Sequence, residues 1–523
     1  MNLDPARLQV LLSRLTGIAE TMGAVLRRAA HSPNIKERAD CSAALFTPDG
    51  ELLVQAEHIP VHLGSMPASV LAAIEVFGNS LRPGDQVILN DPFAGGTHLN
   101  DVTLVAPCFD GAELVGWVAN RAHHADLGGA APGSIPADAT DVHQEGLRIP
   151  PMLYSPDVRA LFEANSRTPA ERVGDLDAQV GANAVGVTRF AEVHRQHREI
   201  HGTGAPLDEI LEYGERRIRA ALADLPDGAW RWEDELDSTG SAADLQHPAA
   251  VVVTVTVAGD TITFDFTGTD PQSRGNVNAV EAVTVSAVSY ALRAAIDPTL
   301  PANGGVMRPV TVVAPAGTLV AALPPAAVGA GNVEVSQRVA DVCLGALAEP
   351  CATRVPAAGQ GTMNNLLVGG PGWVYYETVG GGQGGRPGPI PHAGQSGIQV
   401  GMTNTQNTPI EALERAFPMR VLRYHLRRGS GGAGYSPGGE GIERDLQVLE
   451  DCTVSLITER RVSQPWGLWG GEPGAVGENW LLPGGDETRA ERLADKCTVH
   501  LKSGDVVRML TPGGAGWGPP SEA

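Results

Sequence analysis

The chain has 523 residues, 42% of them hydrophobic, and a formal net charge of −22. A chain of this length holds about two to four domains with a well-buried core, and its composition excludes a disordered or fibrous protein. The acidic balance argues against nucleic acid and anionic membrane surfaces as partners, because both are themselves negatively charged.

The first 228 residues predict a region of mixed helices and strands. The clearest helix is expected over residues 5–30, where apolar residues recur at helical spacing after a capping aspartate, Asp4. Pro48-Asp49-Gly50 is a strong turn signal between two short strands within 41–54. The other elements expected here are a helix over 66–77, a buried strand over 86–89 and mostly helical chain over 161–222.

An antiparallel hairpin is predicted around Asp110-Gly111, because apolar segments flank this favoured turn pair on both sides. His98 and His123 are equally far from the centre of that turn, so they would lie directly opposite each other. Asp101 would then face the other side of an unbroken strand. The glycine pair Gly95-Gly96 favours a loop in front of Asp101 instead, which would turn His98 inward.

A composition shift follows Pro226-Asp227-Gly228 and marks the end of this region. The expected fold class is α+β and multidomain: residues 1–228 form a mixed metal-binding domain, 229–355 a central α/β domain, and 356–523 a β-rich domain with glycine loops. The central elements expected are strands over 251–257, 261–266, 310–313 and 319–322 and a helix over 279–295.

The last third of the chain contains four glycine-rich runs. We interpret them as tight turns between short strands. A phosphate-binding loop (a phosphate cradle) at Gly380–Gly385 is the more specific alternative, but no strand-to-helix context supports it.

Residues typical of metal sites are concentrated in the first 145 positions. Six of the fourteen histidines fall between His58 and His143. Within this stretch His98, Asp101 and His123 supply two imidazoles and one carboxylate, a set typical of catalytic metal sites with an open coordination position. The plainer alternative is that these side chains only cap a loop through hydrogen bonds.

Neighbouring polar residues are assigned supporting roles. Asp40 is the expected fourth ligand. His124 and Asp126 are expected to orient the ligand rings or to line the pocket, and Asp40, His124 and Asp126 are the candidate catalytic residues for proton transfer. Further candidates for the pocket wall, or for contacts behind the ligands, are His58, His62, Asp91, Thr97, His143 and Glu145. An equal alternative for His58 and His62 is that they are buried structural imidazoles.

The six cysteines are widely spaced and form no Cys-x-x-Cys pair, which is typical of reduced thiols in a cytoplasmic protein. The N-terminus lacks a secretion pattern, and the longest uncharged run, 309–333, is interrupted by prolines. No Gly-Lys-Ser or Gly-Lys-Thr occurs, so a standard P-loop for ATP is not expected.

Combined motifs resemble the hydantoinase B/oxoprolinase family over nearly the whole chain. The N-terminal matches are Glu37–Ser42, His58–Met66, Asn90–Asp101 and His123–Gly129, and the downstream ones are Gly174–Gln179, Asp265–Gln272, Asn407–Glu411 and Thr511–Gly518. Two positions depart from the family pattern: Ala515 stands where relatives often have glycine, and Trp517 where they have tyrosine. Neither is a proposed ligand.

The resemblance implies one half of an enzyme. Family members include the B-type half of ATP-dependent N-methylhydantoinase, the matching half of 5-oxoprolinase, the β subunit of caprolactamase, and subunits of acetone and acetophenone carboxylases. A separate A-type ATPase subunit, similar to hydantoinase A, is expected to bind ATP and phosphorylate a cyclic amide, with both chains in a heterotetramer. By motif position the family's metal ligands fall on His98, Asp101, His123 and Asp40, and the metal is expected to be zinc, manganese or iron.

Three functions are consistent with these observations. The leading hypothesis is ATP-dependent opening of a hydantoin, a lactam or 5-oxoproline. A ketone carboxylase subunit is the alternative enzyme, although the metal-bearing subunits of those relatives are usually longer. A non-catalytic assembly subunit with a structural metal is the third.

Overall fold

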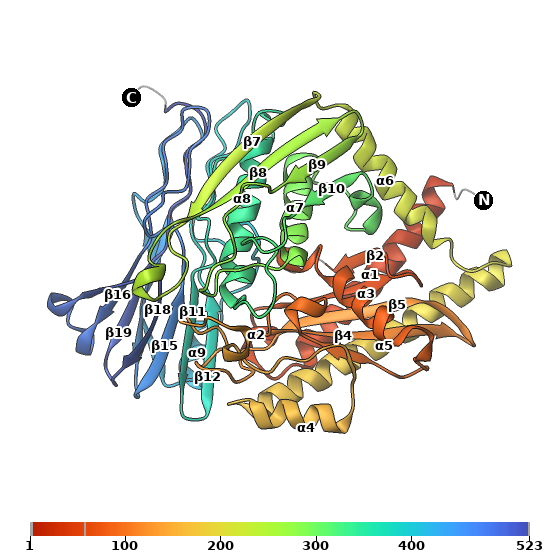
Figure 1. Cartoon of the computed structure of the whole chain (residues 1–523), viewed down its shortest axis with the longest axis horizontal. Coiled ribbons are helices and arrows are strands. Elements are labelled where there is room, and N and C mark those ends of the chain that lie inside the picture. Colours follow the sequence, from red (N-terminus) through yellow and green to blue (C-terminus); the bar gives the residue numbers. More distant parts are fainter. Residues whose placement is uncertain (1–3, 57–58, 521–523) are drawn as a thin grey trace.

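The structure is a computed structural model that describes residues 4–56 and 59–520. Helices and several sheets are mixed along the chain, as expected for the α+β class (Figure 1). The predicted helix over 5–30 is confirmed as α1 (Pro5–Ala29), which the Asp4 side chain caps by accepting from the amide of Ala6.

The N-terminal region is built on a six-stranded sheet with the order β2-β1-β5-β4-β3-β6. Its strands are β1 (Cys41–Phe46), β2 (Leu52–Ala56), β3 (Val87–Leu89), β4 (Asp101–Asp110), β5 (Glu113–His123) and β6 (Met152–Leu153). The helices of this region are α1, α2 (Pro33–Lys36), α3 (Met66–Phe77), α4 (Pro156–Asn165), α5 (Pro169–His201) and α6 (Leu207–Ala223).

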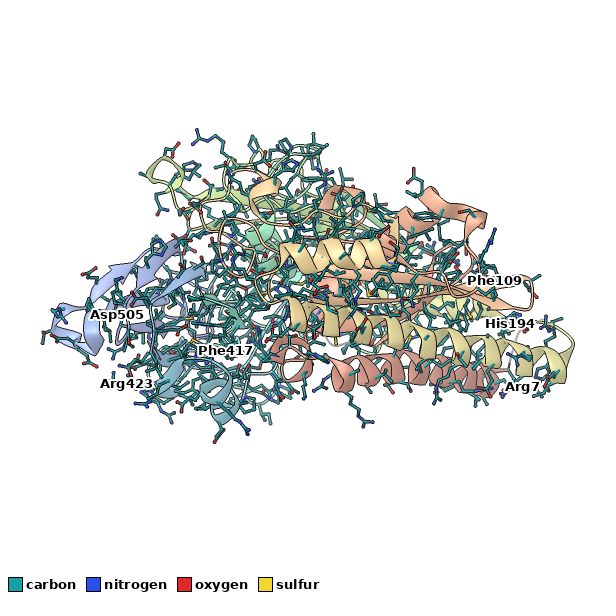
Figure 2. All side chains as sticks on the ribbon, turned by 90° about the horizontal axis from the view of Figure 1, so that it is seen from below. Arg7, Phe109, His194, Phe417, Arg423 and Asp505 are labelled. Carbon is teal, nitrogen blue, oxygen red and sulfur yellow. The ribbon has the colours of Figure 1, made fainter. Side chains whose placement is uncertain are left out.

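Helices cover both faces of this sheet. The long helices α1 and α5 run side by side and pack on one face, and Figure 2 shows the start of α1 near Arg7 and the last turns of α5 near His194. Helix α3 covers the other face, where its Met66, Val70 and Ala73 pack against Trp117 and Ala119 of β5 and their neighbours. Because side chains alternate along a strand, each residue of β4 and β5 belongs to either the α3 face or the α5 face.

The predicted register of the β4–β5 hairpin is wrong. Asp110 pairs with Glu113, so the turn is Gly111-Ala112, and a bulge beside Gly116 shifts the pairing once more. A side chain on Gly116, whose φ is 153°, would overlap the carbonyl oxygen of Phe46, which explains the glycine at the bulge. As a result Asp101, and not His98, lies directly opposite His123.

One apolar segment near α3 has the composition of a membrane helix. Pro60–Phe77 is long and apolar enough to cross a membrane by those two criteria alone, but 44% of it is buried inside the protein. Core helices of soluble proteins have the same character, so this is weak evidence for a membrane span.

The central region contains a four-stranded sheet with the order β10-β9-β8-β7. Its strands are β7 (Gly228–Leu236), β8 (Ala249–Ala258), β9 (Thr261–Asp265) and β10 (Val310–Val313), and α7 (Glu281–Ala295) and α8 (Ser336–Leu347) lie beside it. A π-helical turn over Gly331–Val335 leads directly into α8. The strand predicted over 319–322 is wrong, because Ala321 makes only an isolated bridge to Thr318.

Two sheets packed face to face form the C-terminal region, with the orders β12-β11-β15-β18 and β13-β14-β19-β16-β17. The elements are β11 (Asn365–Gly370), β12 (Trp373–Thr378), α9 (Ile410–Ala416), β13 (Met419–Arg427), β14 (Gly441–Val448), β15 (Cys452–Ile457), β16 (Glu478–Leu482), β17 (Glu491–Leu493), β18 (Lys496–Leu501) and β19 (Val506–Leu510). The largest buried hydrophobic cluster runs from Ile59 to Ala515 and so draws on all three regions. The domain boundaries at 228 and 355 remain predictions.

A network of buried charges joins α8 to the C-terminal sheets. Nζ of Lys496 lies 2.5 Å from Glu459 Oε1 and 2.9 Å from Asp495 Oδ2, and all three side chains are buried. Arg338 of α8 reaches the same Glu459 carboxylate at 3.4 Å. Burial alone would lower the pKa of Lys496, but the two carboxylates outweigh it and raise that pKa above its usual value, so the ammonium stays charged.

The glycine-rich runs are packed segments as well as turns. The amide of Gly439 donates to the carbonyl of Gln383, and the amide of Gly514 donates to the carbonyl of Gly439, each at 2.8–2.9 Å. A side chain on Gly382 would overlap the main chain of both Gly439 and Gly514. Three glycine loops distant in sequence therefore touch through bare backbone. Protein fills the space above Gly382, so the structure gives no support to a phosphate cradle there.

A Gly382→Ala variant is expected to lose about 3 kcal/mol of unfolding free energy, because the atoms in its way are main-chain atoms that cannot rotate aside. Urea denaturation followed by circular dichroism measures this loss. Gly181→Ala is the matched control: it lies in α5 with no atom within 4 Å of the added methyl group, so it should be neutral or slightly stabilising. Equal stabilities for the two variants would contradict backbone packing at Gly382.

Candidate metal centre

Three adjacent strands place Asp40, His123 and Asp101 in one row. His123 pairs with Asp101 across β4–β5, and its amide donates to the carbonyl of Asp40, which directly precedes β1, at 3.1 Å. Residues paired across strands present their side chains on the same face. The row therefore lies on the α3 face of the sheet, beyond the N-terminal end of that helix.

His98 reaches this row from the loop that precedes β4. Gly95, with a φ of 92°, turns the chain, and Gly96 fits against the carbonyls of Asn90 and Asp91, where a side chain would clash. The amide of Asp101 donates to the carbonyl of His98 at 3.2 Å, which closes the loop. The interpretation of Gly95-Gly96 as a loop that turns His98 inward agrees with this geometry.

His98, Asp101 and His123 converge closely enough to share one ion, and one donor atom of each lies within 4.8 Å of the others. Nδ1 of His98 is 3.3 Å from Asp101 Oδ2, Nδ1 of His123 is 3.4 Å from Asp101 Oδ1, and the two ring centroids are 5.1 Å apart. Donors held about 2.1 Å from a tetrahedral metal lie about 3.4 Å from one another, so these spacings fit a divalent cation.

The hydrogen bonding of these side chains gives an independent test. Both ring nitrogens of His98, Nε2 of His123 and Oδ1 of Asp101 are buried and make no hydrogen bond within the described part of the chain. Each such atom costs about 1–3 kcal/mol when left unsatisfied. A cation in their midst would take one nitrogen from each ring and an oxygen from Asp101, so these residues fit a metal.

The charge states suit ligation. Burial alone would raise the pKa of the Asp101 carboxyl, but His98, His62 and His123 outweigh it and hold that pKa well below its usual range. Burial also lowers the pKa of His123. At neutral pH the site therefore offers a carboxylate together with a neutral imidazole at His123, the forms that bind metals.

Thr97 and His62 lie beside Asp101. The Thr97 hydroxyl donates to Asp101 Oδ2 at 2.9 Å, and His62 Nε2 lies 3.4 Å from the same oxygen. The Nδ1 atom of His62 is 2.9 Å from the Ser42 hydroxyl, which fixes the ring. His58 falls outside the described residues.

Asp91 and Asp40 are close to the site but in different ways. Asp91 pairs with Arg148 at 2.7 Å and accepts the amide of Gly96 on its carbonyl, so it supports the loop that carries His98. Asp40 is almost fully buried and accepts a long hydrogen bond of 3.5 Å from the Asn34 amide. It lies outside the group of three that converge within 4.8 Å, so its ligation remains a prediction.

His124 and Asp126, which are expected to orient the ligand rings or to line the pocket, make other contacts in the structure. His124 points to the α5 face, where its Nε2 lies 2.9 Å from Gln179 Oε1 and its ring meets Phe162 edge-on. Successive side chains along a strand point to opposite faces, so His124 faces α5 because His123 faces α3. Asp126 is fully engaged with the Arg167 guanidinium and amide and with two further amides.

His143 and Glu145 also lie elsewhere. His143 is exposed and pairs with Asp141. Glu145 is buried and accepts the amides of Val328 and Gly329 at the start of the helical segment that leads into α8. Glu145 therefore connects the N-terminal region to the central region. Burial raises the pKa of the Glu145 carboxyl to about 8.

Sequence reasoning missed Tyr376, an aromatic residue from β12 that covers His123. The two rings are stacked, with centroids 4.5 Å apart and planes 16° apart. Arg38 contacts the same tyrosine, with its guanidinium carbon 5.0 Å from the ring centroid. No local pattern could reveal this contact, because about 250 positions separate Tyr376 from His123 in the sequence.

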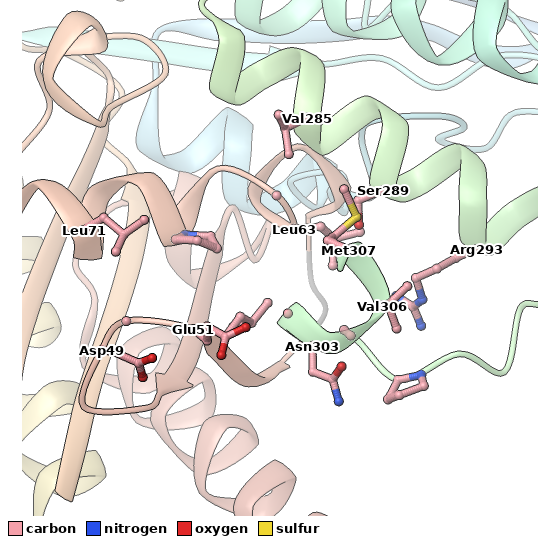
Figure 3. Close-up of a pocket in the computed structure, with 17 residues that line it drawn as sticks. Asp49, Glu51, Leu63, Leu71, Val285, Ser289, Arg293, Asn303, Val306 and Met307 are labelled. Carbon is pink, nitrogen blue, oxygen red and sulfur yellow. The ribbon is translucent and has the colours of Figure 1, made fainter. Parts of the chain in front are cut away.

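A cavity of about 230 Å³ opens between the N-terminal and central regions, close to the segment that carries His62. Figure 3 shows its walls: Asp49 and Glu51 from the β1–β2 turn, Leu71 from α3, and Arg293 from α7. Most of the lining is apolar, and Leu63, the residue after His62, forms part of it.

Comparison with known proteins gives a consistent result. A family model described as hydantoinase B/oxoprolinase matches residues 4–520. The chain is 37% identical to 5-oxoprolinase 1 of Arabidopsis thaliana over 98% of its own length but only 42% of that protein's. It is 31% identical to the putative B-type subunit of a D-/L-hydantoinase from a Pseudomonas species, covering 99% of this chain and 91% of that one.

Solved structures share the fold. An ATP-dependent caprolactamase from Pseudomonas jessenii superposes with a TM-score of 0.88 and 26% identity, over 99% of this chain and 91% of the other. The nucleotide-free structure of an acetone carboxylase also gives a TM-score of 0.88, over 99% and 76% of the two chains. At 19% identity the second likeness concerns the fold alone.

Proposed function

The chain belongs to the hydantoinase B/oxoprolinase family, and from this we propose that it is the metal-bearing subunit of an ATP-dependent enzyme that opens cyclic amides. The single observation that supports this most is the convergence of His98, Asp101 and His123, with four buried donor atoms that make no hydrogen bond in the described structure. The substrate class is a hydantoin, a lactam or 5-oxoproline.

The chemistry divides between two chains. Resonance protects an amide carbonyl from attack, and phosphorylation of its oxygen removes that protection and creates a leaving group. A divalent zinc, manganese or iron ion bound here would activate water and polarise the carbonyl carbon. His98, Asp101 and His123 hold the site, Thr97 and His62 fix the Asp101 carboxylate, and we assign Asp40 as the fourth ligand or the acceptor of the water proton.

We expect ATP to be bound by a partner. The sequence has no P-loop lysine motif and only three lysines. The chain spans less than half of the plant 5-oxoprolinase, and its Pseudomonas relative is named as one of the subunits of a hydantoinase, which implies a second one. We therefore propose an A-type ATPase partner of the hydantoinase A kind, assembled with this chain as a cytoplasmic heterotetramer.

Reconstitution tests this function. The chain is co-expressed with an A-type subunit from the same source and incubated with hydantoin, 5-oxoproline and caprolactam, with and without ATP. We expect ring-opened product and inorganic phosphate from at least one compound, only with ATP and regardless of bicarbonate. Product formed from acetone or acetophenone only with bicarbonate would establish the carboxylase instead. Full activity after complete metal removal would contradict a catalytic metal.

A further inference from the structure

Tyr376 is held by three different contacts. Its ring stacks on His123, its hydroxyl donates to Asn365 Oδ1 at 2.9 Å, and its carbonyl accepts from the Arg38 guanidinium at 2.5 Å. The position and tilt of the ring are therefore fixed.

Asn365 connects Tyr376 to the central region through hydrogen bonds. Its amide donates to Glu334 Oε1 at 2.8 Å and to the carbonyl of Ile457 at 2.9 Å, so the side chain is oriented by two acceptors. Glu334 Oε1 also accepts the amide of Met363 at 3.1 Å. Asn365 and Glu334 are completely buried. The result is a chain of contacts from Glu334 through Asn365 and Tyr376 to His123.

The backbone at Glu334 supports a specific role. Glu334 lies in the π-helical turn over Gly331–Val335, and such turns re-aim side chains and occur often at functional sites. Gly331 allows this turn to pack against the carbonyl of Asn278, where any side chain would overlap. Burial, with the nearby charge of Glu459, raises the pKa of Glu334 to about 8, so a neutral carboxyl group is compatible with this interior position.

We propose that Glu334, Asn365 and Tyr376 form a positioning chain that fixes the imidazole of His123 for metal binding. The three residues do not touch the reacting atoms; they act through His123. Neighbours that orient a ligand ring typically change metal affinity by about 10–100-fold when they are replaced. This inference rests on the metal-binding part of the proposed function, and it is independent of the substrate.

Metal affinity tests the proposal directly. The purified chain is loaded with Zn²⁺ in competition with a chromophoric chelator, and with Co²⁺ to record its visible absorption bands. Tyr376→Leu removes the stacked ring and should weaken Zn²⁺ binding about 10–100-fold and shift the Co²⁺ bands. Tyr376→Phe removes only the hydroxyl that donates to Asn365, and Glu334→Met nearly keeps the volume but removes the oxygen that accepts from Asn365, so each should weaken binding by several-fold.

Tyr375→Phe is the matched control. Tyr375 precedes Tyr376 on β12 but faces the other side, where its ring meets Phe417 edge-on. This variant should bind Zn²⁺ as the wild type does and give the same Co²⁺ spectrum. Near-ultraviolet circular dichroism checks that all variants fold, and the two near-isosteric variants carry the test if Tyr376→Leu does not.

The outcomes separate this inference from the proposed function. A wild type that binds Zn²⁺ tightly, with folded Tyr376 and Glu334 variants of unchanged affinity and spectrum, would overturn the positioning chain and leave the metal centre standing. A folded wild type that binds neither Zn²⁺ nor Co²⁺ would overturn both.

Discussion

A His123→Ala variant should lose its divalent metal and retain less than about 1% of the turnover of the reconstituted enzyme. Loss of a residue that merely supports a ligand already costs about 10–100-fold, and His123 is proposed to be a ligand itself. Its replacement also leaves only two of the three converging side chains, those of Asp101 and His98. Metal content is measured by atomic emission after gel filtration, and turnover by the release of ring-opened product.

His124→Gln is the matched control for this variant. His124 is the next residue but faces α5, and the glutamine amide occupies the position of the imidazole Nε2, so it can still donate to Gln179. The control should keep its metal and most of its activity. Equal losses of metal and of turnover in both variants would contradict the placement of His123 and His124 on opposite faces of the sheet.

Replacement of Lys496 by methionine should lower the free energy of unfolding by about 3–5 kcal/mol. Methionine keeps most of the volume but removes the ammonium, so buried Asp495 loses this cation and buried Glu459 keeps only Arg338, at 3.4 Å. Burial raises the pKa of Glu459 to about 7, which shows how costly its charge already is with lysine present. Urea unfolding at neutral pH measures the loss.

Lys502→Met provides the comparison. Lys502 also pairs with a carboxylate, that of Asp451 at 2.8 Å, but both side chains are exposed. Exposed ion pairs contribute at most about 1 kcal/mol, so this variant should be nearly as stable as the wild type. A loss at Lys496 no larger than that at Lys502 would contradict a structural role for the buried network.

Much of the local structure follows from the sequence. The helix α1 and the β8–β9 hairpin lie where periodicity and turn residues place them, because both depend on neighbours along the chain. Residue chemistry also singles out His98, Asp101 and His123, since few other functions need two imidazoles and a carboxylate so close together. The family resemblance drawn from the motifs is confirmed by the match over residues 4–520.

The errors arise where distant parts of the chain decide the geometry. The bulge of the β4–β5 hairpin places Gly116 against Phe46 and Phe190, which are contacts that turn propensity does not include. Because His124 and His123 are adjacent in sequence, both are assigned to one site, although neighbouring residues on a strand face opposite sides. Tyr376 and Glu334 meet the site only through the packing of three regions.

The interlocked glycine loops have a practical consequence for protein engineering. Segments such as Gly380–Gly385 and Gly513–Gly516 have the composition of flexible linkers, the usual choice for inserting an epitope tag or a fluorescent protein. Here their neighbours are the main chains of other loops, so an insertion would force them apart. The exposed turn at Lys502-Ser503-Gly504, where an added methyl group on Gly504 meets no atom within 4 Å, is the better position for such a label.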